Sequence, residues 1–321
     1  MIKSFKAISF FKRLLCKPMY CTLGHILIGG GTGFVGSKLR DILIKENYKV
    51  TVISRVKTGE NHIISWEELI RNGIPKGITA VVNLTGESIM VPFKYFGSDY
   101  MQRIWISRVG STMLLTDIIN NTKCKPDAFI TITSTDIYPS DGFHTEDYIP
   151  NNKINCNFFT QLASGVENAT YNLSTRVRHV SIRTGTVLDH NGGFMKWLYY
   201  PTLVGLGTNI GNGYQYQPWI HICDLIYLIL FSIENKQING ILNGVSPEII
   251  TNHQLTKIYG QMLNRSVKLN LPQRILIAIY GKERSKLILK GRQVIPMRTL
   301  QYGFKYEYRE IIKALENILR N

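Results

Sequence analysis

The chain has 321 residues, of which 44% are hydrophobic and 19% charged, a composition typical of a globular protein. Its length allows a nucleotide-binding domain with a second lobe, and no apolar run reaches the roughly 18 residues of a membrane helix. The net charge is +16, but no basic block with interleaved aromatics follows the first 23 residues, so nucleic-acid binding is not indicated. Five scattered cysteines without zinc spacing predict no metal site.

The first 23 residues are basic and contain no acidic residue, since Asp41 is the first acid in the chain. On a helix, most of their basic side chains share one face and the large apolar ones lie largely on the other. A basic, acid-free, amphipathic leader is typical of a mitochondrial presequence. We therefore expect residues 1–23 to direct the protein to mitochondria. The alternative is a leader without this role on a cytoplasmic protein.

Strands and helices alternate along the first half of the folded region, which predicts a doubly wound parallel sheet of the Rossmann type, an α/β fold. Short apolar runs are typical of buried parallel strands. Expected strands cover residues 25–28, 48–53, 80–84, 128–133 and 177–182, and expected helices cover 34–46, 98–121 and 157–171.

The alternation loosens after residue 183. Residues 186–220 are rich in Gly, Tyr, Trp and Pro, as loops lining a ligand cleft often are, and residues 221–234 are expected to form a helix. Two or three helices are expected in residues 271–321. We thus divide the chain into the leader, a nucleotide-binding domain over residues 24–240 that contains the cleft segments 186–220, and a smaller C-terminal substrate lobe over residues 241–321.

A glycine-rich loop, GGGTGFVG at residues 29–36, follows the first strand and opens the first helix. In this pattern the first glycine permits a tight turn, the second lets the backbone approach a pyrophosphate, and the third lets the helix pack on the sheet. The helix N-terminus then offers free N–H groups to the phosphates. The loop residues expected to bind a dinucleotide are Gly30, Thr32, Gly33, Phe34, Val35 and Gly36.

The end of the second strand chooses between the two nicotinamide cofactors. NAD-binding proteins usually place an acid there for the ribose hydroxyls, whereas this chain has Ser54 and Arg55 and no acid before Glu60. A guanidinium suits a 2′-phosphate by its charge and its fork of donors. The sequence therefore favours NADP(H) over NAD(H), although Arg55 could also be a solvated side chain without this role.

Several segments in the same order resemble one known family. They are GGGTGFVG, VNLTGESI (82–89), IWISRVGST (104–112), IRTGTVL (182–188), PWIHICDL (218–225), LNGVSP (242–247), LPQRIL (271–276) and VIPMRTLQYGF (294–304). The chain resembles an atypical, extended short-chain dehydrogenase/reductase of the epimerase family, a group related to NAD-dependent epimerases and dehydratases that carries its own C-terminal domain. The resemblance covers about residues 24 to 315.

The resemblance implies further cofactor contacts. Ser54 and Arg55 would contact the adenosine end, while Leu84 and Thr85 would pass beneath the ribose and adenine. Arg103 and Arg108 would face the cofactor from the long helix, Arg108 matching the family's Ser-Arg pair better, and Val187 would lie near the nicotinamide. For each of these residues the alternative is ordinary packing or a solvated charge.

The proton-transfer pair of this superfamily is missing. Its reductases use a Ser or Thr, a Tyr and a Lys four residues later, whose cation lowers the pKa of the tyrosine. Ser134 could fill the first role, but the helix carries Phe159 and Ala163 at the other two positions. Tyr138 is the nearest phenol in sequence, and it could be a substitute acid or purely structural. His221 has the same two interpretations.

Two functional hypotheses follow. The first is an NADP-dependent oxidoreductase or epimerase acting on a small polar or nucleotide-linked substrate through an altered proton relay. The second is a protein that binds NADP(H) without turnover, as a sensor, scaffold or regulator. The cofactor residues support both, whereas the loss of the Tyr and Lys favours the second or an unusual chemistry. The sequence leaves open whether the chain forms a homodimer.

Overall fold

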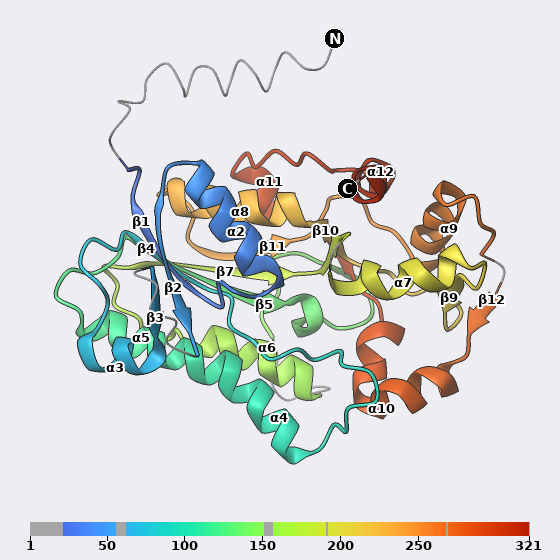
Figure 1. Ribbon diagram of the computed structural model, residues 1–321, viewed down its shortest axis with the longest axis horizontal. Coiled ribbons are helices and arrows are strands. Elements are labelled where there is room, and N and C mark those ends of the chain that lie inside the picture. Colours follow the sequence, from blue (N-terminus) through green and yellow to red (C-terminus); the bar gives the residue numbers. More distant parts are fainter. Residues whose placement is uncertain (1–21, 56–61, 151–156, 191, 268, 321) are drawn as a thin grey trace, which may run out of the picture.

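A seven-stranded sheet forms the centre of the computed structural model, which describes residues 22–55, 62–150, 157–190, 192–267 and 269–320 (Figure 1). The spatial order is β11-β7-β5-β4-β1-β2-β3, with every neighbouring pair parallel. The strands are β1 (His25–Gly29), β2 (Lys49–Ser54), β3 (Ile63–Ser65), β4 (Ala80–Asn83), β5 (Ala128–Ser134), β7 (Arg178–Thr184) and β11 (Gly240–Gly244). The expected doubly wound parallel sheet is confirmed.

Helices cover both faces of the sheet (Figure 1). On one face lie α2 (Phe34–Lys45), α8 (Ile222–Glu234) and α11 (Met297–Gln301); on the other lie α3 (Trp66–Asn72), α4 (Ser98–Trp105), α5 (Ser111–Asn121) and α6 (Phe158–Asn168). Successive side chains of a strand point to opposite faces. Accordingly, Ile26 and Ile28 of β1 join the core under α2 and α8, while Leu27 joins the core under α3 and α5. Burial on both faces explains why β1 is apolar throughout.

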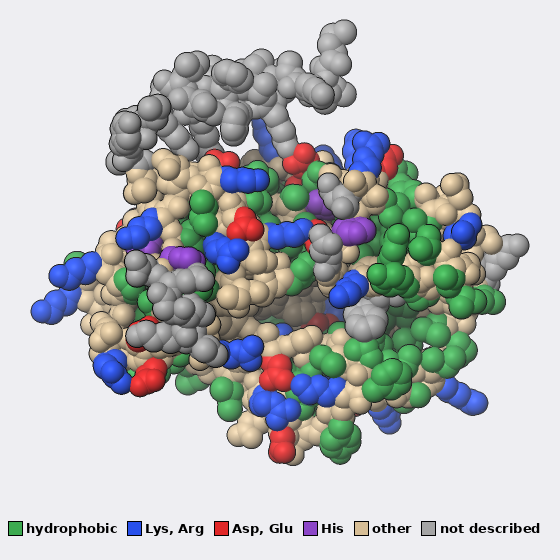
Figure 2. Space-filling view, viewed as in Figure 1, with side chains coloured by type: hydrophobic (Ala, Val, Ile, Leu, Met, Phe, Trp, Pro, Cys, Tyr) green, Lys and Arg blue, Asp and Glu red, His purple; other side chains and the backbone are tan. Residues whose placement is uncertain are grey.

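A smaller lobe lies to one side of the sheet, and Figure 2 shows the surface hollowed beside it. It contains α7 (Gly193–Leu203), α9 (Asn252–Met262), α10 (Gln273–Leu289) and α12 (Ile311–Arg320). Three short parallel pairs complete the chain: β8 (Thr186–Asp189) with β10 (Trp219–His221), β9 (Thr208–Ile210) with β12 (Leu269–Leu271), and β6 (Phe143–His144) with β13 (Gln293–Val294). No helix in the described ranges is long and apolar enough to cross a bilayer.

Three local features differ from the sequence expectations. Residues 186–220, expected as loops, contain β8, α7, β9 and β10, which are too short for a clear apolar period. The central sheet continues through β11, beyond residue 240, where we expected the first domain to end. Residues 98–121 do not form one regular helix, because a π-helical turn, Ile106–Gly110, separates α4 from α5.

The π-helical turn frees backbone acceptors, and nearby hydroxyls occupy them. Ser111 donates to the carbonyls of Ser107 and Arg108, at 2.8 and 3.0 Å, and Thr112 donates to that of Arg108 at 2.7 Å. Such turns are short insertions that change which side chains face a neighbour. Here the turn carries Arg108, whose side chain lies against the segment after β4.

Arginines of the C-terminal region tie it to the nucleotide-binding domain. The buried Arg284 of α10 donates to the carbonyls of Ile89, Val91 and Lys94 in the segment after β4. Arg292 donates to the carbonyl of Tyr138 and forms an ion pair with Asp136, both after β5. An arginine carries five donors in a rigid fork, so one side chain can satisfy several carbonyls of an irregular segment. These loops are therefore held by residues far away in the chain.

Candidate functional site

The glycine loop connects β1 to α2 in a turn that larger residues could not adopt. Gly30 has a positive φ of 77°, which favours glycine. A Cβ added to Gly36 would lie 2.2 Å from the carbonyl oxygen of Gly30. Gly33 caps α2 at its N-terminus, no side chain of the described residues accepts a hydrogen bond at this cap, and Thr32 and Gly33 are exposed. The loop thus has the close packing and the open helix N-terminus that a dinucleotide phosphate needs.

The start of α2 also contacts the lobe. Phe34 lies against the backbone of Gly192 and Gly193, where a Cβ on Gly192 would come within 2.4 Å of the Phe34 ring. Lys38, one turn further along α2, forms an ion pair of 2.5 Å with Asp189 of β8. Val35 is half-buried against the core. The cofactor helix and the beginning of α7 are therefore packed together.

Ser54 and Arg55 lie beside the glycine loop. Gly29 of β1 is in register with Ile53 of β2, so the next two residues follow the carboxyl end of the strand neighbouring the loop. Ser54 is half-buried and Arg55 is exposed. This position fits the adenosine end of a dinucleotide in a Rossmann fold.

The segment after β4 begins at the same edge of the sheet. The Leu84 N–H donates to the Gly29 carbonyl at 2.8 Å, and the Leu84 carbonyl would be 2.7 Å from a Cβ on Gly30. Thr85 donates its hydroxyl to Asn83 at 2.6 Å and lies 2.5 Å from the hydroxyl of Ser111. Leu84 and Thr85 are therefore next to the glycine loop, as the family resemblance implied.

The two arginines of the long helix have different surroundings. Arg108 donates to the Glu87 carbonyl at 2.8 Å, and its guanidinium lies against Gly86, where a Cβ would be 2.7 Å from Cζ. Burial lowers the pKa of Arg108 to about 10. Arg103 is half exposed and lies 3.6 Å from the Glu87 carboxylate. Arg108 thus supports the backbone after β4, whereas Arg103 forms a surface ion pair.

Val187 lies in β8, where it is half-buried and in register with Ile220 of β10. Its carbonyl is close to Gly193, which has a positive φ of 63°. The strand pair β8–β10 therefore leads from the carboxyl edge of the sheet into the lobe.

The α6 positions expected for the tyrosine and lysine are apolar and buried. Phe159 is 4% exposed and stacks on Phe96, with ring centroids 5.7 Å apart. Ala163 is 4% exposed and packs in a cluster with Tyr138 and Val245. Neither side chain can donate or accept a proton, so α6 supplies no acid–base group at these two positions.

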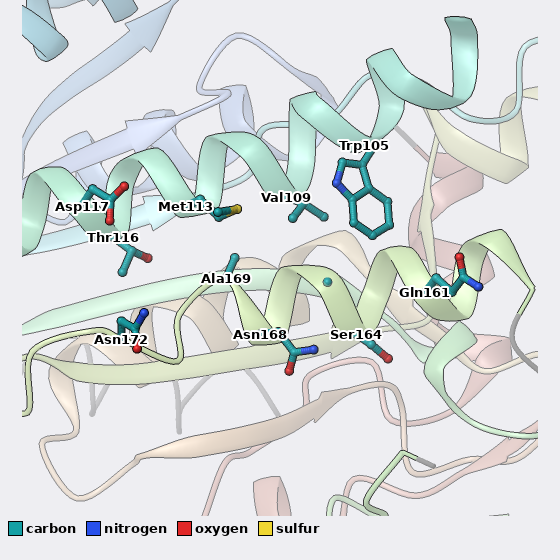
Figure 3. Close-up of a pocket in the computed structure, with 11 residues that line it drawn as sticks. Trp105, Val109, Met113, Thr116, Asp117, Gln161, Ser164, Asn168, Ala169 and Asn172 are labelled. Carbon is teal, nitrogen blue, oxygen red and sulfur yellow. The ribbon is translucent and has the colours of Figure 1, made fainter. Parts of the chain in front are cut away.

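A groove of about 580 Å³ lies on the other side of α6, between this helix and the α4–α5 region (Figure 3). Trp105 enters it beside Gly165, where a Cβ would be 3.0 Å from the indole ring. None of the expected cofactor residues lines this groove. It is therefore separate from the glycine loop.

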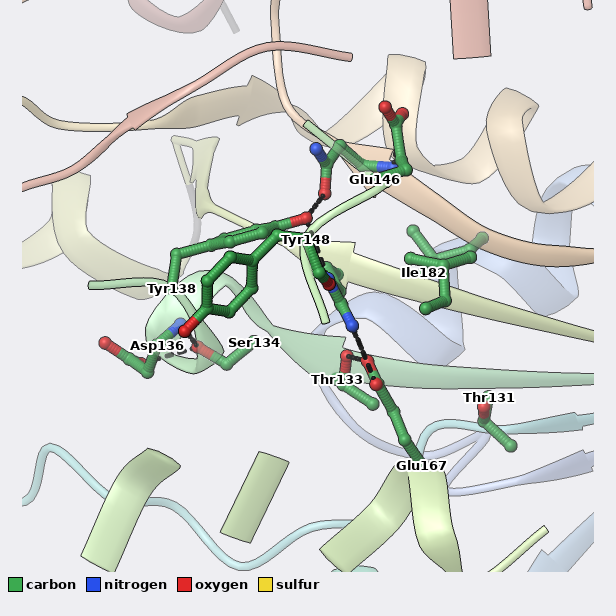
Figure 4. Close-up of polar contacts among 12 residues, drawn as sticks. Thr131, Thr133, Ser134, Asp136, Tyr138, Glu146, Tyr148, Glu167 and Ile182 are labelled. Carbon is green, nitrogen blue, oxygen red and sulfur yellow. Dashed lines mark hydrogen bonds and ion pairs between the residues drawn. The ribbon is translucent and has the colours of Figure 1, made fainter. Parts of the chain in front are cut away.

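Ser134 and Tyr138 follow β5 but differ in burial (Figure 4). The Ser134 hydroxyl donates to the Asp136 carboxylate at 2.5 Å and accepts from the Asp136 N–H, which caps a 3₁₀ turn, Thr135–Ile137. Tyr138 is 2% exposed; its hydroxyl donates to Asn243 at 2.7 Å and accepts from Arg183 at 3.0 Å. Burial raises the pKa of Tyr138. This tyrosine is enclosed by protein groups instead of facing open space.

The network around Tyr138 contains a buried ion pair that sequence reasoning missed. Glu167 of α6 contacts the guanidinium of Arg183 through both carboxylate oxygens, at 2.7 and 2.9 Å (Figure 4). The Arg183 side chain is fully buried, and hydrogen bonds and charge from Glu167 raise its pKa despite the cost of burial. An arginine inside an otherwise apolar strand was the available signal, because a buried charge needs a partner.

Glu146 is a second buried acid that the sequence did not single out. It is 3% exposed and accepts hydrogen bonds from the backbone N–H groups of Asn243, Arg298 and Thr299. A carboxylate at the first turn of a helix satisfies N–H groups that lack partners within the helix. Glu146 therefore fixes α11 against the edge strand β11.

His221 lies at the start of α8 and is 1% exposed. Its Nδ1 accepts from the Cys223 N–H at 3.2 Å, and its ring packs on Tyr308 with centroids 3.8 Å apart. Burial lowers the pKa of His221 to about 4, so the ring is neutral near pH 7. These contacts make His221 a helix cap at the junction with the lobe.

Comparisons with known proteins cover most of the chain. Residues 26–243 match a family described as the NAD dependent epimerase/dehydratase family, and residues 271–318 match a domain of unknown function, DUF1731. The human epimerase family protein SDR39U1 is 35% identical over 296 residues, which are 92% of this chain and 99% of the human one.

Solved structures show the same likeness. A crystal structure of human SDR39U1 (isoform 2) with NADPH has a TM-score of 0.88 and 34% identity, covering 92% of this chain and 99% of the other. The UDP-glucuronic acid 4-epimerase of Bacillus cereus, in complex with UDP-glucuronic acid and NAD, has a TM-score of 0.69 and 19% identity, covering 92% and 98%. At that identity the bacterial enzyme shows a shared fold alone.

Proposed function

This chain belongs to the NAD dependent epimerase/dehydratase family, and we propose that it binds NADPH at the loop between β1 and α2. The observation that carries the proposal is the loop itself. A methyl group at Gly36 would collide with the backbone of Gly30, while the exposed Gly33 leaves the N-terminus of α2 open. The human relative was crystallised with NADPH.

Residues of this chain would hold the two ends of the cofactor. The N–H groups at the start of α2 would bind the diphosphate, Leu84 and Thr85 would pass beneath the adenosine, and Val187 would lie towards the nicotinamide. When bound, the nicotinamide supplies hydride-transfer chemistry.

We propose that Arg55 selects NADPH over NADH. It is exposed at the end of β2, where an acid would favour NADH. Replacing Arg55 with Asp removes a charge-assisted contact to the 2′-phosphate and adds a repulsive charge. NADPH affinity should fall by about tenfold or more while NADH affinity is retained.

The matched control is Arg176→Asp, an equally exposed charge reversal in the turn before β7. Binding is followed by the fluorescence of the reduced nicotinamide for both cofactors and both variants. An unchanged NADPH/NADH affinity ratio in Arg55→Asp would refute the role of Arg55. Absence of NADPH binding to the parent protein would refute the proposal as a whole.

For the reaction, we propose an oxidoreductase or epimerase acting on a small-molecule substrate. Burial of Phe159 and Ala163 in apolar clusters favours a second candidate, a protein that binds NADPH without turnover as a sensor or regulator. The two differ in a direct assay. The absorbance of NADPH at saturating protein should fall with a carbonyl substrate if the protein is an enzyme. Constant absorbance across a broad panel, with NADPH still bound, supports the second candidate.

A further inference from the structure

The segment that forms one wall of the lobe carries almost no charge. Among residues 192–219 only Lys196 is charged, whereas seven residues are aromatic. Two of these aromatics are clearly exposed, Tyr200 at 67% and Tyr214 at 75%. Exposed aromatic side chains gathered in one region mark binding surfaces more often than isolated ones do.

This segment lies beside the carboxyl edge of the sheet. At its start, Gly192 packs on Phe34 next to the glycine loop. Near its end, the backbone of Tyr216 contacts Gly291, the neighbour of Arg292, which in turn binds Asp136 after β5. Both ends are therefore connected by contacts to residues that follow β1 and β5. Ligands of open α/β sheets bind at this edge.

The segment after β4 adds further apolar surface. Phe93 is 81% exposed and Tyr95 is 88% exposed, and the Phe93 N–H donates to the Ile279 carbonyl of α10. Figure 2 shows hydrophobic side chains gathered over the lobe, along the margin of the hollow. The surface around the hollow is thus predominantly apolar on the side of the lobe.

Cations that could bind a diphosphate are occupied by protein groups. Arg284 donates to three backbone carbonyls after β4, and Arg292 is committed to Asp136 and the Tyr138 carbonyl. Arg265 donates to the Leu203 carbonyl at 2.8 Å. Recognition of a phosphate is typically bidentate and needs a guanidinium with free donors. A nucleoside-diphosphate substrate would therefore have to displace structural contacts.

We propose that this cleft, bounded by residues 192–219 and 91–97, binds an uncharged aromatic molecule and not a nucleoside-diphosphate sugar. The proposal identifies the substrate class of the proposed function and rests on it for the role of the ligand. It departs from the polar or nucleotide-linked substrate that the sequence suggested. Aromatic rings stack on Tyr side chains favourably without a charged partner.

Calorimetric titration of the full chain tests the proposal, with 2-acetonaphthone as the uncharged aromatic probe and UDP-glucuronic acid as the competing class. The aromatic ketone should bind more tightly than the nucleotide sugar, both with and without NADPH. Tyr216→Asp and Tyr214→Asp should each weaken the ketone by about tenfold, because a carboxylate replaces an aromatic contact. Tyr171→Asp is the matched control, since Tyr171 is 88% exposed beyond the end of α6.

The outcomes separate the two proposals. NADPH affinity, measured in the same variants, reports whether each one is folded and whether the cofactor site is intact. If NADPH binds but UDP-glucuronic acid binds more tightly than the ketone, the aromatic cleft is wrong and the cofactor proposal stands. Equal weakening by Tyr171→Asp would also overturn the cleft. Loss of NADPH binding in the parent protein, with ketone binding retained, would overturn only the cofactor proposal.

Discussion

Two glycines of the cofactor loop should respond differently to the same methyl group. At Gly36 a Cβ would lie 2.2 Å from the Gly30 carbonyl oxygen and 2.8 Å from the Gly31 Cα, and both are backbone atoms that cannot rotate away. Restoring ordinary contact moves α2 by about 1.2 Å, and overpacking of this kind costs about 1–3 kcal/mol. Gly36→Ala should lower both the free energy of unfolding and NADPH affinity.

Gly33→Ala is the contrasting variant. Its φ of −79° suits alanine, and the nearest atom, the Gly30 carbonyl oxygen, is 3.3 Å from the added Cβ. The free energy of unfolding should therefore stay within about 1 kcal/mol of the parent value. NADPH affinity should still fall by about tenfold, because the methyl group occupies the side from which the diphosphate approaches.

Urea denaturation without cofactor measures the first quantity for both variants, and nicotinamide fluorescence measures the second. The reasoning fails if Gly36→Ala unfolds at the same urea concentration as the parent. It also fails if Gly33→Ala binds NADPH with unchanged affinity, since the loop would then bind no diphosphate.

Three further predictions concern other parts of the chain. Glu167→Gln leaves the buried Arg183 without a countercharge and should cost about 3–5 kcal/mol in urea denaturation; a loss below about 1 kcal/mol would contradict this. Burial lowers the pKa of His179 to about 4 from 6.5, so its contribution to stability is complete above pH 6.5 and is lost as the pH falls towards 4. His179→Gln should remove up to about 3 kcal/mol of that acid sensitivity, and parallel pH profiles would refute it. Residues 1–23, most of which lie outside the described residues, should direct a fused fluorescent protein to mitochondria, and diffuse fluorescence would exclude this.

The sequence predicted those parts of the fold that depend on local patterns. The glycine loop was recognisable because each glycine answers a steric demand within six residues, and β1 and β4 because both their faces are buried. The π-helical turn was not predictable, since it depends on Ser111 and Thr112 donating to carbonyls of the preceding turn. The helix α7 was missed because Gly192, Gly193 and Pro201 are typical of loops.

The polar network of the site lay beyond sequence reasoning for a different reason. Tyr138 reaches Asn243 across 105 residues, and Arg183 meets Glu167 only because β7 and α6 pack together. Spacing along the chain contains no trace of such contacts. By contrast, the replacement of the catalytic pair by Phe159 and Ala163 was visible in the sequence, and the structure adds that both side chains are buried.

The arginines of the C-terminal region impose an order on biosynthesis. Arg284 binds the carbonyl of Ile89 across 195 residues, and Arg292 binds that of Tyr138 across 154. A nascent chain emerging from the ribosome has therefore made the whole central sheet before it makes the donors for the loops at its carboxyl edge. Until then those loops must rely on water, and contacts of such long range form slowly. The rim of the cleft should accordingly be the last part to become rigid, when the remainder of the molecule is already folded.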